Sequence, residues 1–159
     1  MRRRVLLLLS FVAVVLTLTA CNGAPGMTKE QYAAKVSRLC LVAADQLREI
    51  HLDYTVGDWR HYASTIVHID ENFARRLAAL TPPSSLASAA ANYRKATARV
   101  AQDDAEAVAA AKAGDVTRFL LAIRKVSMDS PATYPPAKAM GARGCYIRLF
   151  TRRRSSRAR

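Results

Sequence analysis

The sequence predicts an all-α protein, an up-down four-helix bundle closed by one disulfide, and three observations lead to this fold class. Apolar residues recur at intervals of three and four along four long segments, which is the period of amphipathic helices. Glycine is scarce, with 6 residues, and alanine is abundant, which favours helix over sheet. Cys40 and Cys145 lie where the first helix and the end of the last helix would meet in such a bundle.

The first 20 residues have the pattern of a secretory signal peptide. Arg2, Arg3 and Arg4 precede an uncharged run from Val5 to Ala20. The run is shorter than the about 20 residues that a helix needs to cross a bilayer, and no positively charged cluster follows it. We therefore expect a cleaved signal peptide at residues 1–20, and a retained transmembrane helix is the less favoured alternative.

The residues from Leu18 to Cys21, "LTAC", resemble the lipobox of bacterial lipoproteins. The resemblance implies cleavage just before Cys21 and a diacylglyceryl group on its sulfur, which would anchor the protein to the extracytoplasmic side of the cell membrane. Two acyl chains hold a protein stably on a bilayer, and residues 21–27 would supply the lipidated cysteine and a short tether. A plain secreted protein is the alternative, but Leu18 is not the small residue that its cleavage site would need.

The first two expected helices have clear boundary signals. Thr28 and Gln31 form a capping box for a helix over about 29–52, which the sequence "DYTVGD" interrupts. Asp58 is expected to cap the second helix, and the "TPP" sequence from Thr81 to end it. Three aromatic residues of the second helix are expected in the core: Trp59, Tyr62 and Phe73.

The third expected helix begins at Ser84 or Ser85 and continues to about Ala113. Gly114 should end it in the left-handed conformation, and Asp115 should cap the fourth helix. The expected core stripe of the fourth helix consists of Val116, Phe119, Leu120, Ile123 and Val126.

Three prolines, Pro131, Pro135 and Pro136, cannot lie inside a continuous helix, so a break is expected near 129–136. A short helix should resume around Ala137 and lead to Cys145. The expected bundle domain covers residues 28–149, and a basic, disordered tail covers 150–159.

The cysteine count indicates one disulfide. If Cys21 carries lipid, Cys40 and Cys145 remain, and disulfides persist in exported proteins. We therefore expect these two to pair, with two separate buried thiols as the alternative.

The segments "YAAKVSRLC", "LTPP", "AKAGD" and "GARGC", spread over residues 28–146, resemble a pattern found in small helical lipoproteins and secreted proteins of actinobacteria. The resemblance implies a helical bundle with a terminal disulfide, and it brings no established activity. The chain departs from that pattern in its three prolines after the fourth helix and in its arginine-rich tail.

Residues that often carry chemistry do not form a recognisable site in the sequence. His61 and His68 share a helix face but are separated by about 10 Å of helical rise, and His51 belongs to another helix, so we expect no metal. Three carboxylates in the third helix are expected on a solvated face: Asp103, Asp104 and Glu106. No nucleophile motif or phosphate-binding loop appears, so we expect no enzyme and no cofactor.

The sequence therefore favours a membrane-anchored envelope lipoprotein, a non-enzymatic binding or scaffolding module whose protein partner is unknown. The basic tail is either a soluble terminus or a segment that adheres to anionic lipid or wall polymer. Its arginines are Arg152, Arg153, Arg154, Arg157 and Arg159. Nucleic acid is excluded as a partner by the expected export.

The alternative function is a carrier that holds a lipid or a haem-like molecule between the helices. A cavity at the proline break, lined by Met128, Tyr134 and Met140, would favour the carrier. The alanine-rich third helix favours close packing instead, because small side chains let helix backbones approach one another.

Overall fold

The computed structural model describes residues 26–50 and 54–146, and within these ranges the chain is helical, with no strand. The helices are α2 (Lys29–Glu49), α3 (Val56–His61), α4 (Ala63–Ala78), α5 (Ala87–Ala113), α6 (Val116–Asp129) and α7 (Tyr134–Ala139). There are three short 3-10 turns among these residues: η1 (Ser84–Leu86) between α4 and α5, η2 (Ser130–Thr133) between α6 and α7, and η3 (Arg143–Cys145) after α7. The predictions for the signal peptide, Cys21, the arginine tail and His51 lie outside the described residues.

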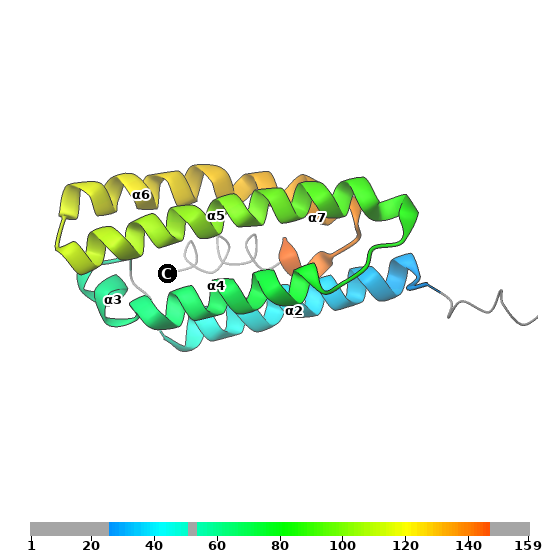
Figure 1. The fold of residues 1–159 in the computed structure, drawn as a ribbon, viewed down its shortest axis with the longest axis horizontal. Coiled ribbons are helices and arrows are strands. Elements are labelled where there is room, and N and C mark those ends of the chain that lie inside the picture. The colour runs from blue at the N-terminus through cyan, green and yellow to red at the C-terminus, as the bar shows by residue number, and fades with distance from the viewer. Residues whose placement is uncertain (1–25, 51–53, 147–159) are drawn as a thin grey trace, which may run out of the picture.

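The long helices lie side by side in an elongated body, with α5 in contact with most of the other elements (Figure 1). It packs against α6 along its length and also against α4, α3 and α7. The α2 helix packs against α4 and against η3. The all-α class is therefore confirmed for the described residues, and α2 contacts η3, the last helical element among them.

The α2 helix begins as the sequence predicts. The backbone N–H of Gln31 donates to Thr28 Oγ1 at 3.2 Å, and the Thr28 N–H donates to Gln31 Oε1 at 3.0 Å. Both halves of the capping box are present, so two of the otherwise unpaired donors at the helix start are satisfied.

The second predicted helix is interrupted, which the sequence pattern did not indicate. It consists of α3 and α4, and the backbone leaves helical geometry at Tyr62. Its cap is Thr55, whose hydroxyl accepts from the Asp58 N–H at 3.1 Å. Asp58 as the cap was therefore wrong: it lies in the first turn, and its carboxylate accepts from the Thr55 hydroxyl at 2.7 Å.

The connection from α5 to α6 follows the prediction. Gly114 has a φ of 73°, in the left-handed region that glycine adopts without steric cost. Asp115 then caps α6 by accepting from the Arg118 N–H at 2.9 Å.

The predicted break after α6 is present, but the chain stays helical through most of it. It passes through η2 and resumes as α7 at Tyr134, a few residues earlier than expected. Pro135 and Pro136 lie in the first turn of α7, where a backbone N–H has no helical partner in any case. Proline therefore starts this helix rather than preventing it.

Two separate clusters of buried side chains form the core. The disulfide-end cluster comprises Tyr32, Val36, Leu39, Leu77, Leu86, Ala90, Tyr93, Ala137, Met140 and Ala142. The tryptophan-end cluster comprises Trp59, Ala63, Ile66, Ala107, Val108, Ala110, Ala111, Phe119 and Ala122. Tyr62 and Phe73 are half-buried against these clusters, and Trp59 is buried, which agrees with the core positions predicted for them.

The predicted disulfide joins Cys40 of α2 to Cys145 of η3, with a Cα–Cα distance of 5.1 Å. Tyr93 of α5 donates its hydroxyl to Cys40 Sγ at 3.0 Å, because the oxidised sulfur can only accept. Three elements that are distant in sequence therefore meet at this one bond.

Candidate functional site

The α6 helix carries a strip of exposed apolar side chains. Val116 is 55% exposed, Leu120 and Leu121 are each 58% exposed, and Met128 is 67% exposed. Helical spacing places all four on one side of α6, with Arg124 among them. We call these five residues the α6 outer face.

The outer face exists because α6 packs on α5 through its opposite side (Figure 1). Phe119 and Ala122 are the buried residues of that opposite side. The prediction that Val116 and Leu120 belong to the core was therefore wrong, since the apolar stripe is wider than a single neighbouring helix covers. Leu121 is apolar but lies outside the predicted core stripe. Its position in the sequence indicates that α6 has apolar residues on two sides.

A cluster of charged residues joins α5 to α6. Arg99 Nε donates to Asp129 Oδ2 at 2.6 Å, and Lys125 Nζ donates to Glu106 Oε2 at 2.7 Å. Asp103 is buried beside them, at 6% exposure. Burial, and then the neighbouring Asp129 carboxylate, raises the pKa of Asp103, while the hydrogen bond from Arg99 lowers the pKa of Asp129.

The predicted solvated face for these carboxylates was therefore wrong for Asp103. Asp103 and its neighbour Asp104 point to different sides of α5: Asp103 faces Asp129 of α6, whereas Asp104 interacts with Asp70 of α4. The Asp103 cluster is suited to holding α5 and α6 together. Among residues 26–50 and 54–146, no three His, Cys, Asp or Glu side chains are grouped so as to hold a metal ion.

Asp70 and Asp104 form a second acidic pair, between α4 and α5. Both side chains are half-buried. Burial raises the pKa of Asp70 to about 6. Burial first, and then the charges of Asp70 and Asp103, raise the pKa of Asp104 to about 8. Two facing carboxylates with raised pKa values repel each other when both are ionised, so a cation between them would be stabilised.

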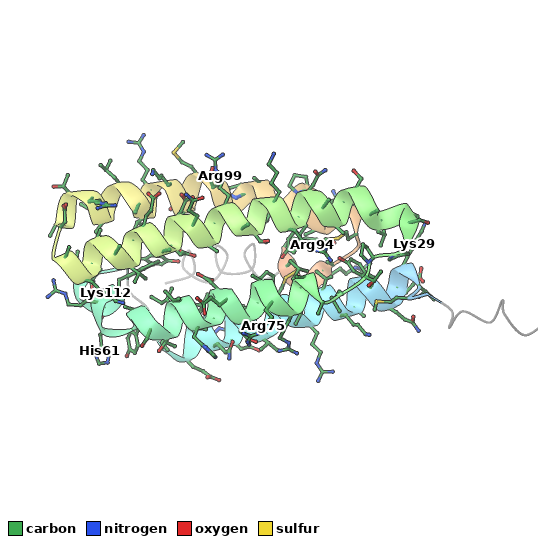
Figure 2. The ribbon with its side chains drawn as sticks, in the orientation of Figure 1. Lys29, His61, Arg75, Arg94, Arg99 and Lys112 are labelled. Atoms are coloured by element: carbon green, nitrogen blue, oxygen red, sulfur yellow. A yellow bond between two sulfur atoms is a disulfide. The ribbon has the colours of Figure 1, made fainter. Side chains whose placement is uncertain are left out.

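The described histidines lie on the surface, in contrast to Asp70, Asp103 and Asp104. His61 and His68 are exposed. Figure 2 places His61 and Lys112 at one end of the molecule, and Arg94 and Lys29 at the other. Among the aromatic contacts of the described residues, His61 takes part in one, with the ring of its neighbour Tyr62.

Two consecutive residues of α5 near the disulfide, Tyr93 and Arg94, make hydrogen bonds that stabilise the fold. Burial raises the pKa of Tyr93, so its hydroxyl stays protonated and keeps donating to Cys40. Arg94, the next residue, donates to the carbonyl oxygens of Leu77 and Leu80 at 3.2 and 2.6 Å. These bonds join α5 to the last turn of α4 and to the segment that follows it.

The cavity that would favour a carrier does not form around the proline break. Met128 is exposed on α6, whereas Met140 is buried in the disulfide-end cluster, so the two do not line one space. A groove between α2 and α4 has a volume of about 10 Å³, enough for about one water molecule. A wider, open recess of about 510 Å³ lies beside the start of α2, and Met27, Pro82 and Pro83 are among its lining residues.

No protein-family model, curated protein or solved structure matches this chain. Within the described residues, none of the helices is long and apolar enough to cross a membrane. The α6 outer face, the Asp70–Asp104 pair and the open recess are therefore the features from which a function has to be argued.

Proposed function

We propose that the protein is a non-enzymatic binding or scaffolding module of the bacterial envelope, anchored by lipid on Cys21 after removal of residues 1–20. In this proposal residues 28–149 fold as an up-down bundle that residues 21–27 tether to the membrane. The α6 outer face binds a protein partner in the envelope. The "LTAC" sequence supports the anchor, and the exposed strip on α6 supports the binding role.

The observation that carries the binding role is the exposure of four large apolar side chains on one helix face. Contiguous exposed apolar surface is uncommon on soluble proteins and marks interaction sites. Val116, Leu120 and Met128 are separated by four and eight residues, which places them along one face as in a helix that packs into a groove. Arg124 lies among them, and arginine is enriched in protein interfaces.

Site-specific crosslinking in the producing cell tests the binding role. A photo-reactive residue at Leu120 should crosslink one discrete envelope protein, while the same residue at Ala98, an exposed position on α5, should not. With that protein purified, Leu120→Asp should raise the dissociation constant of the complex at least about tenfold, because a central apolar anchor in an interface contributes more than about 1 kcal/mol. Ala98→Asp should leave it unchanged, and equal binding by both variants would contradict the proposal.

The anchor has a separate test. Replacing Cys21 with serine should move the protein from the membrane fraction to the soluble envelope fraction and abolish incorporation of labelled fatty acid. Membrane retention of the Cys21→Ser protein would contradict the lipid anchor and leave the binding role of α6 untouched.

A carrier remains the second candidate function because of the open recess beside α2. Its volume of about 510 Å³ lies in the range of small-molecule sites, about 300–1,000 Å³. Native mass spectrometry of the exported protein should reveal extra mass that is lost on denaturation if the recess holds a lipid or haem-like ligand. A bare mass would exclude a co-purified ligand and leave the scaffold.

A further inference from the structure

The two sulfur atoms of the disulfide have different surroundings. Tyr93 donates its hydroxyl to Cys40 Sγ at 3.0 Å, whereas Cys145 Sγ faces the main-chain carbonyl oxygen of Val36 at 3.7 Å. One sulfur therefore lies beside a hydrogen-bond donor and the other beside an acceptor. This asymmetry matters when a thiol attacks the bond, because one of the two sulfurs must leave with the electron pair.

The donor beside Cys40 is held in place by the core. Tyr93 is 3% exposed and belongs to the disulfide-end cluster. Burial raises the pKa of its hydroxyl, and the neighbouring Tyr32 adds to the effect. The hydroxyl therefore stays protonated near neutral pH and can donate to a negative charge on Cys40.

The acceptor beside Cys145 is held in place by the contact of η3 with α2. A Cβ atom on Gly144 would collide with the Ser37 carbonyl oxygen and would lie 2.9 Å from Leu41 Cγ, so this turn rests directly on α2. Val36 is itself fully buried in the disulfide-end cluster. The close contact keeps Cys145 Sγ beside the Val36 carbonyl oxygen.

These neighbours have opposite effects on the two sulfurs once the bond opens. A thiolate on Cys40 would accept the Tyr93 hydrogen bond, and a bond to the charged form favours that form. A thiol on Cys145 would instead donate to the Val36 carbonyl oxygen, which favours the neutral form. Cys40 is therefore the better leaving group of the two, and a better leaving group makes attack on its partner sulfur faster.

We propose that the Cys40–Cys145 bond is a site of directional exchange with small thiols, in which the incoming thiolate attacks Cys145 and Cys40 leaves as a thiolate bonded to Tyr93. The incoming sulfur forms a bond to Cys145 Sγ, the bond between the two Sγ atoms breaks, and its electron pair goes to Cys40 Sγ. One thiolate is consumed and one is released, so the step needs no other reagent. This inference does not depend on the proposed binding function.

Trapping of the released thiol provides a direct test. The exported Cys21→Ser chain is used because Cys40 and Cys145 are then its two cysteines. The folded, oxidised protein is treated briefly with 2-mercaptoethanol, the reaction is stopped with excess N-ethylmaleimide, and the labelled peptides are identified by mass spectrometry. Maleimide on Cys40 with mercaptoethanol on Cys145 should exceed the reverse product at least about tenfold. Equal amounts, or an excess of the reverse product, would overturn the proposal.

Two tyrosine variants test the source of the preference. Tyr93→Phe keeps the ring and removes the donor, so the preference for release of Cys40 should fall severalfold. Tyr32→Phe is the matched control, because it removes another buried hydroxyl of the same cluster, one that bonds to neither sulfur in the described structure. Its preference should equal that of the starting chain. No change in Tyr93→Phe, or an equal loss in both variants, would overturn the proposal.

The same reaction in concentrated urea separates the folded environment from the local sequence. With the chain unfolded and the disulfide intact, neither the Tyr93 hydroxyl nor the Val36 carbonyl is held beside its sulfur, so the two products should form in similar amounts. The same product ratio in urea and in the folded protein would overturn the proposal, because the fold would then have no part in the direction of exchange.

Discussion

The two ends of the bundle are held together by different means. At the disulfide end, side chains from α2, α5 and α7 meet around the Cys40–Cys145 bond. At the tryptophan end there is no covalent link among the described residues. There Trp59 and Phe119 pack edge to face, with ring centroids 5.8 Å apart, against small residues such as Ala107 and Ala111.

The two ends differ in how far apart in the sequence their segments lie. The cysteines are 105 positions apart in the sequence, so bringing them together costs much chain entropy, and a covalent bond offsets that cost by restricting the unfolded chain. The tryptophan end joins α5 and α6, which one short turn at Gly114 connects. Close packing of alanines is sufficient there, because small side chains allow the helices to approach closely.

The largest expected effect is at the tryptophan end. Phe119→Ala should lower the free energy of unfolding by about 3–5 kcal/mol, because it removes a fully buried ring and leaves a cavity against Trp59. Urea unfolding followed by circular dichroism measures this. Leu120→Ala, one residue further on and exposed, is the matched control and should cost much less. Similar losses for the two variants would contradict the two-sided description of α6.

The second effect concerns the disulfide end. Cys40→Ser/Cys145→Ser should cost about 2–5 kcal/mol, since the unfolded chain regains the freedom of a long loop. A reducing agent should destabilise the wild type by a comparable amount and leave the double variant unchanged in the same thermal unfolding assay. Destabilisation of the double variant by reductant would show that the bond is not the source of the effect.

The smallest effect is a pH dependence that tests the Asp70–Asp104 pair between α4 and α5. Asp70 and Asp104 have pKa values raised to about 6 and about 8, so the folded state holds protons that the unfolded state has already released. The stability from these groups should be fully present below about pH 4 and lost as the pH rises through 6 to 8.

Asp104→Asn should flatten the upper part of that slope in urea unfolding measured at several pH values. An unchanged slope in the Asp104→Asn variant would contradict the raised pKa of Asp104.

The sequence predicted local features well where the signal lies within a few residues. The capping box at Thr28, the left-handed Gly114 and the Asp115 cap all appear as expected, because each depends on a single turn of chain. The interruption at Tyr62 was missed. The apolar stripe of the second helix continues across it, and periodicity does not register a short break.

The burial of individual side chains was predicted less reliably. Leu120 and Asp103 are the clearest cases: the leucine is exposed although it lies in an apolar stripe, and the aspartate is buried although it lies in a charged run. Each outcome depends on where α6 lies relative to α5. No pattern within one helix contains that information.

The sequence by itself thus determined the long helices, the caps at Thr28 and Asp115, and the pair of cysteines that joins α2 to η3, because periodicity, capping and cysteine count are properties of the chain. Only the tertiary structure decided that one side of α6 stays uncovered, that Asp103 is buried and that Asp70 faces Asp104. The physical reason is that the environment of a side chain is set by the elements that pack around its helix, and those elements come from distant parts of the sequence.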